Sequence, residues 1–199
     1  MAVIGAIFAG GKARRLSGQN KAQISLGGRT LISRQYERIS PVSDDILVLA
    51  PVWPEWIEAF SGVRWVQDKL VDDAPIGPAG ALLAALNFCN ESYGSSAILI
   101  TAPVDAPFVP QAAFEKLIEV VRKGKPAAIA KTASGLQPAF GAWHTQCLPE
   151  MNERVLQGDY ALQTIASAVG AAHIQFEDES AFLNINTPED LSAAQSRIA

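Results

Sequence analysis

Residues 3–15 read VIGAIFAGGKARR, a strand-like apolar run that leads directly into a glycine-rich turn and a basic cluster. A continuous apolar run of this length is typical of a strand covered on both faces, as in parallel α/β sheets. Gly10 and Gly11 let the backbone after the strand approach a ligand closely and point amide N–H groups toward it. The stretch therefore predicts a buried parallel strand that ends in a phosphate-binding turn.

The basic residues are concentrated at this end of an acidic chain. The net charge is -4, yet no acidic residue precedes Glu37. A local positive field suits a small polyanion, whereas nucleic-acid binding usually requires a broad basic surface. We therefore expect a phosphate-rich small ligand and no nucleic-acid partner. The first 36 positions contain six basic residues: Lys12, Arg14, Arg15, Lys21, Arg29 and Arg34.

Length and composition are those of an ordinary globular protein. The 199 residues, 49% hydrophobic and 18% charged, are enough for one domain with a buried core. No apolar run approaches the roughly 20 residues that span a bilayer, and the N-terminus lacks the features of a secretory signal. We expect a soluble, cytoplasmic protein without a membrane partner. Cys89 and Cys147 lack metal-ligand spacing and are expected to stay reduced.

Strand-like and helix-like segments alternate along the chain, which predicts a three-layer α/β/α fold with a mostly parallel sheet. In such sheets ligands bind at the carboxyl ends of the strands, so the turn after residue 8 and the turn around Asp105 are expected to share one site. Strands are expected near residues 2–8, 46–50, 64–67, 96–101, 126–130, 139–142 and 171–176. Helices are expected near residues 30–39, 78–91, 110–122, 145–157, 160–167 and 188–198.

The glycine-rich turn differs from two well-known phosphate loops. Ala13 stands where the Walker A pattern needs a magnesium-binding Ser or Thr, and no Gly-x-Gly-x-x-Gly follows the strand. The remaining phosphate-binding groups are the backbone amides of Gly10 and Gly11, with Arg15 and Lys21 as cationic side chains. The alternative interpretation is a basic surface turn.

Asp105 is an isolated carboxylate in the stretch TAPVDAPFVP, residues 101–110, directly after a predicted buried strand. The flanking prolines stiffen the backbone, and a lone acid at a strand end can hold Mg²⁺ together with substrate phosphates. We favour this role. The alternative is that Asp105 stabilises the turn or caps the helix expected from residue 110, although a cap normally stands immediately before its helix.

Residues 8–16, FAGGKARRL, together with Lys21, resemble the signature of the molybdenum cofactor guanylyltransferases. Further motifs match that family in order, so the resemblance spans residues 5 to about 191. It implies a nucleotide-diphospho-sugar transferase-like, Rossmann-like fold in which residues 1–199 form a single nucleotidyltransferase domain. The further motifs are Asp68 with GPAG (77–80), PVDAP (103–107), QPAFGAW (137–143) and NINTPEDL (184–191).

The activity that the resemblance implies is transfer of GMP from GTP to the terminal phosphate of molybdenum-molybdopterin, with pyrophosphate as the second product. The phosphate oxygen attacks the α-phosphorus in line, so neither a covalent intermediate nor a general base is required. His144 and His173 are accordingly interpreted as structural. The implied cofactor is Mg²⁺, and a molybdenum insertase or a molybdoenzyme chaperone is a candidate partner.

The resemblance also implies roles for residues at matching positions. The carboxylate of Asp68 can accept hydrogen bonds from guanine N1–H and N2–H and repels the acceptor edge of cytosine; the alternative is a solvated acid. Asn184 and Asn186 are expected on the pterin or product side of the site. The implied catalytic residues are Arg15, Lys21 and Asp105, with Asp105 as the metal ligand. The implied nucleotide-binding residues are Phe8, Ala9, Gly10, Gly11, Lys21, Asp68, Gly80 and Asp105.

The chain departs from the family pattern at four places. Asn20 replaces the usual Asp before Lys21, and the lost charge alters the electrostatics of Lys21 or of the metal. Two alternatives to the guanylyltransferase stay open: a cytidylyl- or sugar-phosphate nucleotidyltransferase, and a noncatalytic nucleotide- or molybdopterin-binding module. The other departures are Ser17 for Gly, Phe8 for Leu, and Ala50-Pro51 where a polar residue near the guanine is common.

Overall fold

The computed structural model of the protein describes residues 1–10 and 20–198. Its strands are β1 (Val3–Phe8), β2 (Ser25–Leu26), β3 (Arg29–Thr30), β4 (Asp45–Ala50), β5 (Arg64–Gln67), β6 (Leu70–Val71), β7 (Ala74–Pro75), β8 (Ile98–Pro103), β9 (Ala127–Thr132), β10 (Gly135–His144) and β11 (Ala172–Gln175). The α-helices are α1 (Leu31–Ile39), α2 (Pro78–Tyr93), α3 (Gln111–Arg122), α4 (Leu148–Leu156), α5 (Leu162–Ala168) and α6 (Pro188–Ile198). Short 3-10 helices are η1 (Lys21–Gln23), η2 (Ser40–Val42), η3 (Glu55–Ala59), η4 (Thr145–Cys147) and η5 (Glu179–Phe182).

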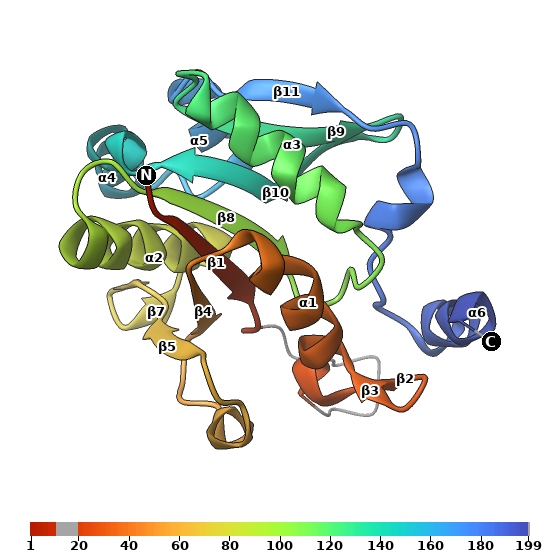
Figure 1. The fold of residues 1–199 in the computed structure, drawn as a ribbon. Helices are drawn as coiled ribbons and strands as arrows, with labels where there is room; N and C mark the ends of the chain where they lie inside the picture. Colours follow the sequence, from red (N-terminus) through yellow and green to blue (C-terminus); the bar gives the residue numbers. More distant parts are fainter. Residues whose placement is uncertain (11–19, 199) are drawn as a thin grey trace.

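Seven strands form one central sheet in the order β11-β9-β10-β8-β1-β4-β5, with helices on both faces (Figure 1). The pairs β1–β4, β1–β8, β4–β5 and β9–β11 are parallel, whereas β10 is antiparallel to both of its neighbours. The predicted three-layer architecture with a mostly parallel sheet is therefore confirmed. Two small hairpins, β2–β3 and β6–β7, complete the strand pairing of the described residues.

Side chains of β1 alternate between two apolar cores. Val3 and Ile7 belong to the core that includes residues of α1 and α3, whereas Ile4 and Ala6 belong to the core that includes residues of α2, α4 and α5. All four side chains are almost fully buried. Coverage on both faces explains why the strand is continuously apolar in sequence.

Local signals fix where the helices near the site begin. Thr30 caps α1 by accepting a hydrogen bond from the N–H of Ser33, at 3.3 Å. Gly77, with φ of 68°, turns the chain into α2, whose first residue is Pro78. The helix expected over 145–157 is instead divided into η4 and α4, with Pro149 in the first turn of α4.

No helix within residues 1–10 and 20–198 is long and apolar enough to cross a membrane.

Candidate active site

A cleft of about 760 Å³ lies where β1, β4 and β8 end at the carboxyl edge of the sheet. Phe8 and Pro103, the last residues of β1 and β8, are paired across the sheet, which brings the following segments together. The two predicted site segments therefore do meet at one edge. Gly11 and Arg15 lie outside the described residues. The predicted residues that line the cleft are Phe8, Gly10, Lys21, Asp68 and Asp105.

The ammonium group of Lys21 is held between Asp105 and Asn186. Its Nζ donates to Oδ2 of Asp105 and to Oδ1 of Asn186, the latter at 2.6 Å. The side chains of Lys21 and Asp105 are only 10% and 15% exposed. Because little water reaches this ion pair, its attraction is screened less than that of a surface pair.

The backbone places Asp105 at the end of β8 rather than at the start of a helix. The N–H of Val104 donates to the carbonyl of Phe8 at 3.1 Å, which joins the turn to the end of β1. The residue that precedes α3 is Pro110, with no side-chain cap. The carboxylate of Asp105 is therefore bound to Lys21, and the alternative role as a helix cap is excluded.

One carboxylate oxygen of Asp105, Oδ1, does not accept the hydrogen bond from Lys21. Oδ1 is buried and has no hydrogen-bond partner among the described residues. A buried carboxylate oxygen of this kind suits a hard cation such as Mg²⁺. Within residues 1–10 and 20–198, no group of three or more His, Cys, Asp or Glu side chains is placed so that it could hold a metal ion. A metal here would accordingly need further oxygens from substrate phosphates or water.

Asp68 follows β5 at the other end of the cleft. Its Oδ1 is buried and unpaired among the described residues, and burial raises the pKa of its carboxyl group to about 6. A Cβ built on Gly10 would lie 3.4 Å from Oδ2 of Asp68 and 2.8 Å from the ring of Pro51. The absence of a side chain at Gly10 therefore keeps open the space in front of this carboxylate.

Gly80 contacts the backbone of Lys69, next to Asp68, and is not among the residues that line the cleft. The N–H of Lys69 donates to the carbonyl of Gly80 at 3.1 Å. A Cβ on Gly80 would lie 2.4 Å from the carbonyl oxygen of Lys69. The glycine thus allows the first turn of α2 to pack directly against the backbone that carries Asp68.

Most of the remaining cleft wall is apolar, which the sequence motifs did not reveal. Pro51 lies where a polar residue near guanine is common, and its carbonyl accepts a hydrogen bond from the Gln67 side chain at 3.2 Å. The available sequence signal was that apolar and proline residues follow several strand ends. These lining residues are Leu49, Pro51, Val52, Pro75, Pro78, Ala81, Pro103 and Val104, beside Gly77.

Asn20, the departure next to Lys21, has a local structural role. Its side-chain oxygen accepts a hydrogen bond from the N–H of Ala22 at 3.0 Å and so caps η1. Asn and Asp are both favoured at such positions, because either supplies a side-chain acceptor. The substitution therefore retains the helix start that carries Lys21.

The two predicted asparagines lie in different places. Asn186 contacts Lys21, whereas Asn184 lines a second cavity of about 370 Å³ beside α6. In that cavity the guanidinium of Arg197 lies 4.4 Å from the ring centroid of Phe108. The structure thus assigns only one of the pair to the lysine and carboxylate cluster.

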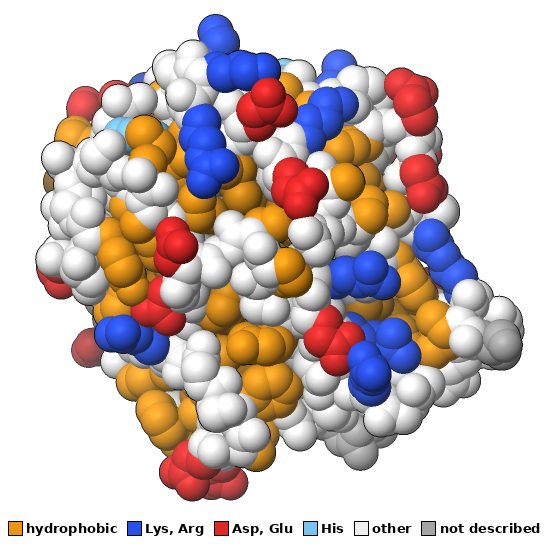
Figure 2. Space-filling view, viewed as in Figure 1, with side chains coloured by type: hydrophobic (Ala, Val, Ile, Leu, Met, Phe, Trp, Pro, Cys, Tyr) orange, Lys and Arg blue, Asp and Glu red, His pale blue; other side chains and the backbone are white. Residues whose placement is uncertain are grey.

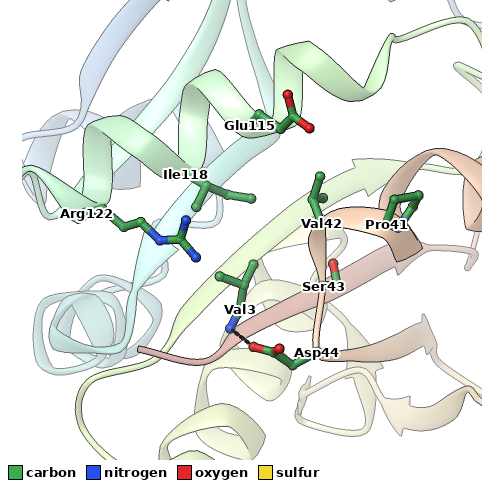
Figure 3. Close-up of a pocket in the computed structure, with 8 residues that line it drawn as sticks. All are labelled: Val3, Pro41, Val42, Ser43, Asp44, Glu115, Ile118 and Arg122. Atoms are coloured by element: carbon green, nitrogen blue, oxygen red, sulfur yellow. Dashed lines mark hydrogen bonds between the residues drawn. The ribbon is translucent and has the colours of Figure 1, made fainter.

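A further cavity, of about 360 Å³, lies at the opposite edge of the sheet, where β1 begins (Figure 3). There the N–H of Val3 donates to the carboxylate of Asp44 at 2.8 Å, and α3 contributes Glu115 and Arg122. None of the described residues predicted for the site lines it. On the face shown in Figure 2, basic and acidic side chains of the described residues are interspersed. The cleft at the carboxyl edge is therefore the candidate active site.

Comparison with known proteins finds relatives that match almost the whole chain. The MobA-like NTP transferase domain matches residues 5–174. A molybdenum cofactor guanylyltransferase from Cereibacter sphaeroides is 36% identical over 196 residues, which cover 98% of this chain and 97% of that protein. The fold is similar to that of molybdopterin-guanine dinucleotide biosynthesis protein A from Archaeoglobus fulgidus, with a TM-score of 0.78, 23% identity and 98% of each chain covered. It is also similar to that of a 2-C-methyl-D-erythritol 4-phosphate cytidylyltransferase from Thermus thermophilus, with a TM-score of 0.69, 18% identity and coverage of 99% of this chain and 98% of that chain.

Fold, cleft and family match together define a nucleotidyltransferase with the nucleotide-diphospho-sugar transferase-like fold. The chain belongs to the MobA-like NTP transferase family, which confirms the resemblance inferred from its motifs.

Proposed function

We propose that this protein transfers GMP from GTP to the phosphate of molybdenum-molybdopterin, giving molybdopterin guanine dinucleotide cofactor and pyrophosphate. The observation that carries the proposal is one cleft that contains both the Lys21–Asp105 ion pair and Asp68, whose Oδ1 has no hydrogen-bond partner among residues 1–10 and 20–198. A nucleoside triphosphate has matching parts, a hydrogen-bonding base and a polyanionic tail.

In this proposal the base lies in the apolar part of the cleft, against Asp68. The ionised carboxylate accepts hydrogen bonds from N1–H and N2–H of guanine. Cytosine presents acceptors at that edge, which a carboxylate repels. Leu49 and Pro51 contribute apolar surface to the same cleft.

The triphosphate then extends toward Lys21. It lies along the segment of Phe8, Ala9 and Gly10, and Gly11, which is outside the described residues, is expected to contribute its backbone amide. Lys21 and Arg15 neutralise its charge. The N–H of Ala9 already donates to the carbonyl of Leu49 at 2.8 Å, so this turn is joined to β4 before a nucleotide binds.

The metal in this proposal is Mg²⁺, held by Asp105. Oδ1 of Asp105, which no described residue contacts by a hydrogen bond, would be available to a metal while Oδ2 keeps its bond to Lys21. When bound, Mg²⁺ supplies positive charge that polarises the phosphate under attack and offsets the charge of the leaving pyrophosphate.

The reaction is a single displacement. A phosphate oxygen of molybdopterin forms a bond to the α-phosphorus while the bond from that phosphorus to the pyrophosphate oxygen breaks. Lys21 and Arg15 stabilise the added negative charge. No proton has to be removed, because the attacking phosphate is already anionic. The acceptor approaches from the side of Asn184 and Asn186.

The pterin substrate suggests where the protein works and what it meets. We expect it in the cytoplasm, with a molybdenum insertase or a molybdoenzyme chaperone as a partner that delivers or collects the pterin. Neither a nucleic acid nor a membrane has a part in this proposal.

The test is transfer of label from α-labelled GTP or CTP to molybdenum-loaded molybdopterin in the presence of Mg²⁺. Transfer from GTP alone would support the proposal. Transfer from CTP would retain the reaction class and contradict the role of Asp68. Nucleotide binding without transfer from either would instead support a sugar-phosphate nucleotidyltransferase or a noncatalytic module, which an assay with sugar phosphates separates.

A further inference from the structure

We propose that Asp190, in the first turn of α6, is a positioning residue for the transfer reaction: it holds Asn186 so that the carboxamide of Asn186 fixes the ammonium group of Lys21. The inference rests on the proposed function for its catalytic consequence. The positioning itself is a property of the protein without substrate.

Asp190 makes more contacts than a helix cap requires. Thr187 precedes α6, and its Oγ1 accepts a hydrogen bond from the N–H of Asp190 at 3.2 Å. In return, Oδ2 of Asp190 accepts from the N–H of Thr187 at 2.9 Å. These two bonds form the reciprocal capping box that commonly begins a helix.

A third bond extends beyond the capping box. Oδ2 of Asp190 also accepts from the N–H of Asn186, at 2.9 Å. Asn186 stands one residue before the cap and outside the helix, so this bond fixes the backbone of the residue whose side chain contacts Lys21. The bonds from Asn186 and Thr187 lower the pKa of Asp190, which keeps the carboxylate ionised near neutral pH.

The neighbouring residue is anchored from the opposite side. The N–H of Ile185 donates to the backbone carbonyl of Asp105 at 2.8 Å. The segment that carries Asn186 is therefore tied at one end to Asp105 and at the other to Asp190. With the backbone held twice, Oδ1 of Asn186 stays 2.6 Å from Nζ of Lys21.

Without Asp190 the second anchor is lost, although the first remains. Asn186 then samples other positions, so that of its two partners among the described residues Lys21 retains Asp105. A cation that must stabilise charge in the transition state works best when it is already held in place. Loss of Asp190 should therefore affect kcat more than the KM for GTP.

The test compares Asp190→Ala, Asn186→Ala and the double variant, with Ser192→Gly as a matched control. Ser192 is exposed on α6, and glycine there weakens the helix without touching Asn186. One readout is GMP transfer. The other is the rate at which an amine-acylating reagent modifies Lys21 in the substrate-free protein, followed by mass spectrometry of the peptide that contains it.

We expect Asp190→Ala to lower kcat about 10-fold and to increase the labelling rate of Lys21 several-fold, with Asn186→Ala acting alike. If Asp190 acts through Asn186, the double variant should be no worse than Asn186→Ala alone. Asp190→Glu can still form a capping box, so it should keep both kcat and the labelling rate of Lys21 close to the wild-type values. Ser192→Gly should lower the melting temperature but leave both readouts within about twofold of the wild type.

Additive effects in the double variant, or equal effects of Ser192→Gly and Asp190→Ala, would reduce Asp190 to an ordinary helix cap. If the wild type transfers no GMP, the proposed function fails. The labelling rates then decide the positioning role by themselves, because they need no substrate.

Discussion

Lys21 and Asp105 are 84 positions apart in the sequence, yet their side chains form an ion pair that is 10% and 15% exposed. The pair joins the segment after β1 to the turn after β8. Removing one partner of a poorly hydrated ion pair leaves the other charge uncompensated, which is costly. The pair therefore contributes to the stability of the cleft as well as to its charge.

Asp105→Asn is expected to lower GMP transfer by at least about 100-fold while the protein stays folded, since it removes the charge that holds Lys21 and the metal. The free energy of unfolding should fall by about 1–3 kcal/mol, because both side chains keep some contact with water. Transfer assays and chemical denaturation measure the two effects. Glu91→Gln removes one negative charge from an exposed position of α2 and should change neither. Full activity of Asp105→Asn would contradict the assigned role.

Asp68→Asn is expected to reduce the preference for GTP over CTP by roughly 10–100-fold, since an amide accepts one guanine hydrogen bond but presents its own N–H₂ to the other donor. Competition between the two nucleotides, for binding and for transfer, measures this ratio. An unchanged ratio would show that the base is recognised elsewhere in the cleft.

GTP affinity should depend on pH through Asp68, whose pKa burial raises to about 6. Only the ionised carboxylate accepts both guanine hydrogen bonds, so binding is full above the pKa and weakens as pH falls through it. At pH 5 we expect affinity about 10-fold below that at pH 7.5. GTP's own terminal phosphate also titrates, so calorimetry should compare wild type with Asp68→Asn. If both proteins show the same pH dependence, Asp68 is not its source.

Gly80→Ala is expected to destabilise the protein by about 1–3 kcal/mol and to weaken GTP binding, because a Cβ lies too close to the carbonyl of Lys69. Movement of Lys69 displaces the adjacent Asp68. Ala84→Gly in the same helix should cost about 1 kcal/mol through helix propensity yet leave GTP affinity unchanged. Denaturation and calorimetry on both variants separate the two effects; equal GTP affinity in Gly80→Ala would contradict this account.

Both cysteines should resist modification in the folded protein. Cys89 and Cys147 are free and buried, and burial raises the pKa of each thiol to about 12. Since the thiolate is the reactive form, a thiol reagent at pH 8 should modify neither in native protein and both after unfolding. Rapid reaction of either thiol in native protein would indicate local opening around it.

The fold is largely predictable from the sequence because its signals are local. The expected strand at 64–67 is β5, and the expected helix at 188–198 is α6. The strand expected at 139–142 is longer in the structure, where β10 covers Gly135–His144 and runs antiparallel. Its direction follows from the short connection after β9, since a two-residue turn joins only antiparallel strands. The strands expected at 126–130 and 139–142 do not include this turn at residues 133–134.

The site is predictable at the level of segments but not of atoms. The rule that strand ends share one edge explains why Lys21 and Asp105 lie in one cleft. It does not say that Asn186 rather than Asn184 contacts the lysine, because that choice depends on the backbone path between Asp105 and α6. The role of Asp190 also depends on that path.

The order of segments along the chain has a consequence for biosynthesis. The last strand of the central sheet ends at Gln175, before the segment that carries Asn186. Protein chains emerge from the ribosome N-terminus first, and their domains can begin to fold as they emerge. The strands that lead to Asp68 and Asp105 are therefore translated before the second partner of Lys21. Lys21 acquires its contact with Asn186 only after the strands that form the cleft have been translated.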